Sequence, residues 1–236
     1  MWLAALLLWS RATAAAADPG PAHRETSGRS VAGAVVRSRE WIIRRGPQRE
    51  EEFVGDVSYR KGPSLLTSDW ALFKHESQTW QARGHVRLKL TLKSGDRVDV
   101  SGETAAYDQT TARGHLLGPK GARISFERFP SEGPPDSGTA RRLDWEGQQN
   151  ARLTGQVHVW GPRLELWGDQ ADYAADHASL TLTGSRPVLH ALQPGDWTGA
   201  VQADRIVALE NPDRLQADGK ARGWIRFKDK LEKLAK

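Results

Sequence analysis

The chain of 236 residues contains no cysteine and a single methionine. The absence of cysteine excludes a disulfide framework, a cysteine-based zinc site and thiol catalysis. It suits a bacterial exported protein that folds without oxidative help. The chain is long enough to bury a sizeable core in one or two domains.

Long apolar runs are nearly absent as well. Residues 1–9 form a short apolar run, which is followed by Arg11 and then by small residues up to Ala17. We expect residues 1–17 to be a secretory signal that is cleaved before Asp18. Nine apolar residues are too few to span about 30 Å of hydrocarbon. The run lacks the usual basic residues at its start, so an uncleaved anchor is the alternative.

Catalytic motifs are also missing. The chain has no Gly-x-Ser-x-Gly elbow, no His-Glu-x-x-His pair and no phosphate-binding loop. Its seven histidines never stand two or four residues apart, which leaves open only a metal site assembled from distant strands. We expect no enzyme, no catalytic residue and no cofactor.

The balance of charge is positive, with a net charge of +5 and an isoelectric point near 9.6. Such a balance favours anionic partners, whether nucleic acid, phospholipid head groups or a phosphorylated glycolipid. No signature of a nucleic-acid-binding fold accompanies it, and an exported protein rarely meets nucleic acid. Ten tryptophans supply apolar area suited to a core or to contact with a lipid or a sugar.

What the chain does contain is strict alternation of apolar and polar residues. Residues 155–160 and 164–167 alternate on either side of a Gly161-Pro162 turn, and residues 180–184 alternate again after a polar turn. This pattern is typical of strands with one buried face. No long segment in the middle of the chain has the 3.6-residue period of a helix. The sequence therefore predicts an all-β protein.

Two short motifs repeat along the chain at intervals of about 30 to 35 residues. The first is a glycine two residues before a branched apolar residue, at Gly55, Gly84, Gly114, Gly155 and Gly223. The second is an acidic residue followed by alanine two positions later and by an aromatic residue four positions later, at Asp69 and Asp169. Looser copies begin at Glu103 and Asp204, and residues 143–145 are a degenerate copy that lacks the acid. We expect the glycines to form bulges, the acids to cap backbone amides, and the small and aromatic residues to share one face.

One further spacing links the two motifs. An acid precedes a glycine by 15 residues in three places, Asp69/Gly84, Asp169/Gly184 and Asp204/Gly219. We interpret the whole as repeats within one domain at 53–227. A flexible leader at 18–52 contains a possible first strand, a Pro- and Gly-rich loop covers 130–139, and a charged tail covers 228–236.

The repeats at residues 53–59, 69–73 and 82–86 resemble the OstA/LptA-type periplasmic proteins of lipopolysaccharide export. Residues 184–189, 203–206 and 217–220 are similar to the C-terminal part of the same domain. The resemblance covers about residues 53–227. It implies a curved antiparallel β-jellyroll, open like a V, in the Gram-negative periplasm.

The resemblance also implies a function. In this family the apolar inner face takes the acyl chains of lipopolysaccharide, and terminal strand edges pair head to tail into a bridge between inner and outer membrane. Transfer needs no bond chemistry. The membrane-anchored relative LptC has a similar fold, so an inner-membrane-associated adaptor of the export transporter is an alternative. A purely structural module that pairs through its strand edges is another.

Under this resemblance the partners are lipopolysaccharide, other export proteins and a further copy of the chain. The inward, lipid-binding residues are then Val57, Tyr59, Val86, Leu88, Leu90, Val157, Val159, Leu164, Leu166, Leu180, Leu182, Ile225 and Phe227. Basic residues at the rim, such as Arg87 and Lys89, would pair with glycolipid phosphates. For each inward residue, a place in a dry core is the alternative.

Overall fold

The computed structural model describes residues 29–31, 34–46, 48–91, 95–130, 133–147, 150–162, 164–174, 179–193, 197–210 and 213–227. The expected signal at 1–17 and the tail at 228–236 lie outside these ranges. Every regular element in the described part is a strand, and each pairing is antiparallel, which confirms the all-β prediction. No helix in these ranges is long and apolar enough to cross a membrane.

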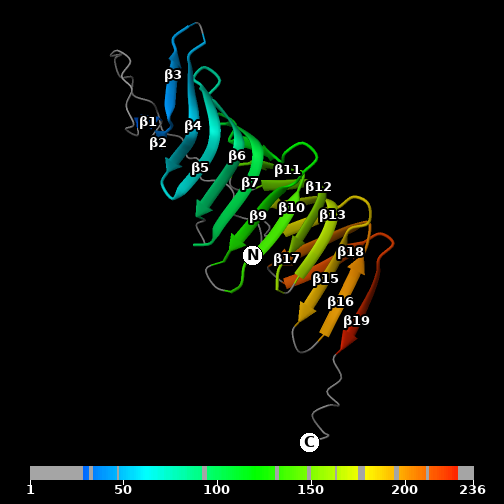
Figure 1. Cartoon of the computed structure of the whole chain (residues 1–236). Coiled ribbons are helices and arrows are strands. Elements are labelled where there is room, and N and C mark those ends of the chain that lie inside the picture. The colour runs from blue at the N-terminus through cyan, green and yellow to red at the C-terminus, as the bar shows by residue number, and fades with distance from the viewer. Residues whose placement is uncertain are drawn as a thin grey trace, which may run out of the picture.

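Nineteen strands form one continuous sheet that stacks along a long axis, from β3 at one end to β19 at the other (Figure 1). The first ten are β1 (Arg29–Val31), β2 (Ala34–Arg37), β3 (Glu40–Arg44), β4 (Glu50–Lys61), β5 (Ser64–Lys74), β6 (Thr79–Thr91), β7 (Arg97–Asp108), β8 (Arg113–Leu117), β9 (Ile124–Phe129) and β10 (Asp136–Ala140). The others are β11 (Arg142–Glu146), β12 (Asn150–Trp160), β13 (Leu164–Ala174), β14 (Ser179–Thr183), β15 (Val188–Gln193), β16 (Trp197–Gln202), β17 (Arg205–Glu210), β18 (Asp213–Asp218) and β19 (Arg222–Phe227).

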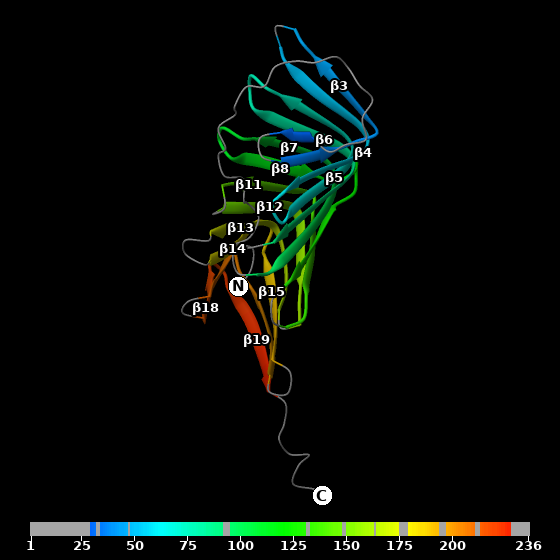
Figure 2. The ribbon, with the colours of Figure 1, turned by 90° about the vertical axis from the view of Figure 1, so that its left-hand side faces the viewer.

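The sheet is folded into two layers because its long strands bend. One half of β4, β5, β6, β7, β12 and β13 lies in each layer. Layer A runs from β3 through these halves, β8, β11, β14 and β17 to β18. Layer B runs from β1 and β2 through the other halves, β9, β10, β15 and β16 to β19. From the side, the two layers diverge like a V from the line of bends (Figure 2).

The bends are made by pairs of residues in the left-handed conformation. Gly84 and His85 have φ of 77° and 47°, and the pairs Gly55-Asp56 and Gly155-Gln156 have nearly the same values. Each pair interrupts the ladder of its strand and turns its direction. The predicted glycine bulges are thus confirmed at these three positions. Gly114 differs, because its φ is not positive and it forms no bend. It leaves room for the Trp145 ring, whose Cζ2 would lie 2.2 Å from an added Cβ.

The 15-residue spacing has a direct structural meaning. In all three pairs the acid packs onto its glycine, and an added Cβ would lie 2.3 Å from Asp69 Oδ2 at Gly84 and 2.6 Å from Asp204 Oδ2 at Gly219. The third acid, Asp169, also caps the turn, because its Oδ2 accepts a hydrogen bond from the Ser185 N–H at 2.6 Å. The Asp69 carboxylate instead binds His85 Nδ1 at 2.8 Å.

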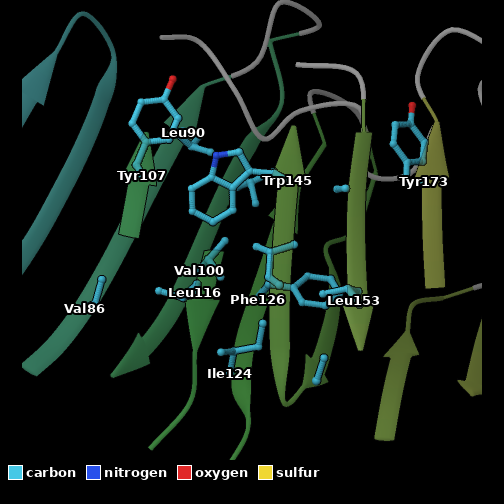
Figure 3. Packing of buried hydrophobic residues seen from close by; sticks show 14 of the residues in the cluster. Val86, Leu90, Val100, Tyr107, Leu116, Ile124, Phe126, Trp145, Leu153 and Tyr173 are labelled. Carbon is cyan, nitrogen blue, oxygen red and sulfur yellow. The ribbon is translucent and has the colours of Figure 1, made fainter. Parts of the chain in front are cut away.

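The core fills the space between the two layers. The expected pairing of small and aromatic residues on one face is confirmed, since Ala71 and Phe73 are both buried, as are Ala171 and Tyr173. Near the bends the core is aliphatic, and its largest fully buried side chains include Leu116, Ile124, Leu143, Leu153, Leu166, Leu182 and Ile206. Figure 3 shows how Leu116, Ile124 and Leu153 share the interior with the rings of Phe126 and Trp145.

Two predicted boundaries need correction. The sheet begins before residue 53, because β2 and β3 both pair with β4, which itself starts at Glu50. The predicted loop at 130–139 is shorter, because residues 136–139 belong to β10. The content of proline and glycine suggested a loop throughout this segment. Gly138 is small for a packing reason instead, because the Phe126 ring would lie 2.2 Å from an added Cβ.

The acid-glycine contact predicts a specific loss of stability. Both Gly84→Ala and Gly62→Ala place a side chain at positive φ, which costs about 1–2 kcal/mol. Gly62 has no atom within 4 Å of an added Cβ, whereas Gly84 meets Asp69. We therefore expect Gly84→Ala to lower the free energy of unfolding by about 1–3 kcal/mol more than Gly62→Ala. Urea unfolding followed by circular dichroism measures both, and equal losses would contradict the packing role of Asp69.

Candidate functional site: the interior between the layers

The interior has an aliphatic bottom at the bends and an aromatic lip on the side where the V opens. On layer A the lip consists of Phe73, Trp80, Tyr107, Trp145 and Tyr173, each one or two residues from a strand end and each buried. Phe73 stacks on Trp80 with ring centroids 4.6 Å apart, and Tyr107 stacks on Trp145 with centroids 6.4 Å apart. Figure 3 shows Tyr107, Trp145 and Tyr173 at the same end of their strands.

Most of the predicted lipid-binding residues meet in this interior. Nine of them are buried in one hydrophobic cluster: Val57, Tyr59, Val86, Leu90, Val157, Val159, Leu166, Leu180 and Leu182. Leu88 and Leu164 are partly buried and pack against the same cluster. The sequence pattern therefore selected one continuous face from four distant segments of the chain.

The last two predicted residues are exposed. Ile225 is 63% exposed and Phe227 is 71% exposed. The strand register places Ile225 beside Gly199 and Ala191, on the inward side of layer B. Both residues lie on β19, the last strand of that layer, and no described residue covers them. Leu215, 46% exposed on the last strand of layer A, faces the same opening.

We call this opening the C-terminal mouth and define it by Leu215, Ala217, Ile225 and Phe227. The opposite end is better closed. There Ala34 and Val36 are buried in layer B, and Trp41 of layer A stacks on Phe53 with centroids 6.0 Å apart. The interior is therefore largely apolar along its length, and its most exposed apolar side chains, Ile225 and Phe227, lie at the C-terminal mouth.

Arg87 and Lys89 are not rim residues of the interior. They alternate with the inward residues Val86, Leu88 and Leu90, so both point to the outer face of layer B. Lys89 there lies 3.5 Å from Asp99. The expected phosphate contacts at these two positions are therefore wrong for a ligand held between the layers.

Buried charge does occur on the layer B side of the interior. Arg128 donates two hydrogen bonds to Asp96 Oδ2, at 2.7 and 3.1 Å, and its Nη1 lies 3.8 Å from Asp136. All three residues are at least nine-tenths buried. Burial raises the pKa of Asp136 above its ordinary value, against the opposing effect of Arg128. Removing one partner of such a cluster leaves a buried charge without compensation, which lowers the free energy of unfolding. The cluster therefore favours one arrangement of this part of layer B.

Little space is left among the buried side chains next to the lip, where a cavity of about 60 Å³ is bounded by Leu88, Leu90, Leu116, Tyr107 and Trp145. A larger and open hollow of about 990 Å³ lies along the ends of the layer A strands and is lined in part by four lip residues, Trp80, Tyr107, Trp145 and Tyr173. The enclosed cavity alone is too small for an acyl chain. The indole Nε1 atoms of Trp80 and Trp145 are buried there and find no hydrogen-bond acceptor in the described part of the chain.

The aromatic lip was missed as a group, although the sequence carried a signal for it. Phe73, Tyr107, Trp145 and Tyr173 are the aromatic members of the second motif. Their repetition indicated a packing role, but not that strand ends would gather them along one opening. The described residues contain no group of three or more side chains suited to holding a metal ion.

Comparison with known proteins adds little to this geometry. No protein-family model matches the chain, and no curated protein matches its sequence. A solved structure that does match is LptH, the LptA-homologous periplasmic component of the lipopolysaccharide transport device of Pseudomonas aeruginosa. The identity is 15%, the match covers 71% of this chain and 95% of LptH, and the TM-score is 0.30. A likeness at this level decides neither family nor function.

The tyrosines provide a test of the closed interior. The chain has three, and burial raises the pKa of Tyr59, of Tyr107 to about 12, and of Tyr173. Since the ordinary value is about 10, neutral tyrosine stabilises the fold below pH ~10, and this contribution is lost as pH rises through the folded-state pKa values.

We therefore expect tyrosinate absorbance to rise together with alkaline unfolding, and Tyr107→Phe to shift that unfolding to higher pH. The measurement is a parallel titration of ultraviolet absorbance and circular dichroism. A tyrosine that ionises near its ordinary pKa while the strand signal stays native would contradict a closed lip.

Proposed function

We propose that this chain is a periplasmic lipid-binding bridge that holds the acyl chains of lipopolysaccharide between its two layers. The observation that carries the proposal is the apolar interior that runs the length of the sheet and stays uncovered at the C-terminal mouth. Ile225 and Phe227 expose 63% and 71% of their surface there, on the inward side of the last strand. A groove that ends in exposed apolar side chains is suited to passing an apolar ligand onward.

The way the layers are joined supports entry at the lip. Backbone hydrogen bonds and covalent chain connect the layers along the bends, while no strand pairing among the described residues crosses the lip. Separating the lip therefore leaves every ladder intact. Each acyl CH₂ group that is buried between the layers contributes about 0.8 kcal/mol to the free energy of binding. A long acyl chain therefore offsets the loss of side-chain contacts when the lip opens. Movement of the lipid along such a groove requires no bond chemistry.

Site-specific photocrosslinking in cells that make lipopolysaccharide tests this proposal. A photoreactive residue at Tyr173 probes the lip, and one at Leu182 probes the buried interior. Asp172 and Thr181 are their outward neighbours on the same strands and serve as matched controls. We expect lipid adducts at both inward positions and none at the controls. Equal labelling of inward and outward positions, or no adduct with an exported and folded chain, would exclude binding between the layers.

A second candidate is an inner-membrane-associated adaptor, or a structural module, that acts through its strand edges. The terminal strands β18 and β19 each pair on one side only in the described part of the chain. The sequence of β19 adds exposed apolar side chains to a free edge, a combination that favours pairing with another chain. This candidate needs no lipid, and it shares its partner-binding end with the bridge.

Edge pairing predicts self-association that depends on the C-terminal mouth. Ile225→Asp places a charge among the exposed apolar residues of β19, whereas Trp160→Asp alters an exposed side chain in the middle of layer B. We expect the mass from sedimentation velocity to rise with concentration in the wild type and in Trp160→Asp, and to stay near that of a monomer in Ile225→Asp. A wild type that stays monomeric, or an Ile225→Asp variant that still associates, would rule out head-to-tail pairing through this end.

A further inference from the structure

A row of aromatic rings crosses the outer face of layer B, on the side opposite the interior. Trp160, His158, Trp167, His190 and Trp224 come from four different strands, and each ring contacts the next. Centroid distances along the row are 4.6, 5.1, 5.1 and 6.5 Å. His158 is also hydrogen-bonded to Glu165 at 2.8 Å. We call these five residues the aromatic row.

Core packing does not explain the aromatic row. Its members alternate with the inward residues Val159 and Leu166, so they point away from the core. Trp160 is 39% exposed and Trp224 is 52% exposed. The outer face of an open sheet is ordinarily polar. Cross-strand pairs of smaller side chains would also stabilise the sheet, so stability alone does not account for tryptophan rings exposed to water.

A hollow of about 310 Å³ continues the aromatic row along the same face. It is lined by the aromatic side chain of Trp160, by the hydroxyls of Ser101, Ser125 and Ser137, and by the carboxylates of Asp99 and Glu127. The strand register places Asp99, Glu127, Ser137 and Trp160 in one line across β7, β9, β10 and β12.

The polar side chains that line the hollow include positively charged, negatively charged and neutral hydroxyl groups. Arg87 and Lys89 line the hollow together with Asp99 and Glu127, so its positive and negative side chains are balanced, and Lys89 lies 3.5 Å from Asp99. Asp99 Oδ1 is buried and accepts no hydrogen bond from the described residues. A nucleic acid or an anionic membrane requires a surface of one sign. A ligand that both donates and accepts many hydrogen bonds, and that has apolar faces, fits this surface better.

We propose that the outer face of layer B binds a linear oligosaccharide. A pyranose ring has a C–H face that packs on an aromatic ring and a rim of hydroxyls that both donate and accept. One sugar stacks on Trp160, and its neighbours extend over the hollow, where serine hydroxyls and the Asp99 and Glu127 carboxylates bind their hydroxyl groups. From β12 to Trp224 the row crosses four strand spacings, about 19 Å, which is room for several sugars in line.

This proposal does not depend on lipid binding between the layers, because the two surfaces lie on opposite faces of layer B. The saccharide has two possible sources, a free polysaccharide or the sugar part of a glycolipid. Titration calorimetry of the full chain distinguishes them. One set of probes is cellohexaose, chitohexaose and maltohexaose, and the other is the deacylated saccharide of lipopolysaccharide.

We expect saturable binding of at least one probe, and a dissociation constant about tenfold weaker or more in Trp160→Ala, because one stacking contact is lost. Val35→Ala removes a side chain of similar exposure, 41%, from the outer face of β2 and serves as the matched control.

Three outcomes overturn the proposal. They are no binding of any probe by the folded chain, equal affinity of the wild type and Trp160→Ala, and binding to phosphatidylglycerol vesicles in place of saccharides. Lipid crosslinking at Leu182 remains a separate readout, so loss of saccharide binding with retained crosslinks rejects this surface alone. Retained saccharide binding without crosslinks rejects the bridge alone.

Discussion

The bend in the long strands is the constraint on which the rest of this structure depends. A strand that turns sharply must insert residues at positive φ without breaking the ladders on either side. Gly84 and His85 do so, and the Asp69 side chain packs against the bend from the neighbouring strand. Because each bend carries one strand from layer A into layer B, the two layers share one side that has no free edge. The free edges of the described sheet are left at its two ends, and among the described residues the lip is closed by side chains.

That arrangement couples stability and ligand entry. The aromatic lip shields the aliphatic bottom from water, as the burial of Tyr107, Trp145 and Tyr173 shows. Under the proposed function, the same rings are the contacts that a ligand would displace, while the bends would keep their hydrogen bonds. The buried Arg128 cluster would then hold layer B in shape. Opening at the lip would break none of the described strand pairings.

Alternation and repeat spacing predicted much of this fold, because both follow from local rules. The side-chain period of a strand assigned Val157, Val159 and Leu166 to one buried face, and the 15-residue spacing of Asp69 and Gly84 proved to be a direct contact. What local pattern cannot supply is the partner of each strand. Ile225 has the alternation of an inward residue, yet it is exposed because no described strand follows β19. Residues 136–139 were predicted to belong to a loop because local sequence does not identify the neighbouring strand either. Gly138 is small because Phe126 from that strand packs against it.

The two faces of layer B show why one sheet can carry two unrelated surfaces. On β12, Val159 is 2% exposed and belongs to the core, while its neighbour Trp160 is 39% exposed and begins the aromatic row. A change of register by one residue would exchange them, so the bend at Gly155 that sets the register of this strand half also decides which side chains reach each face. The buried apolar interior suits the acyl chains that we propose for it. The outer face, with its hollow and mixed charges, suits the hydrated saccharide that we propose there, so the same strands would keep the two sites apart.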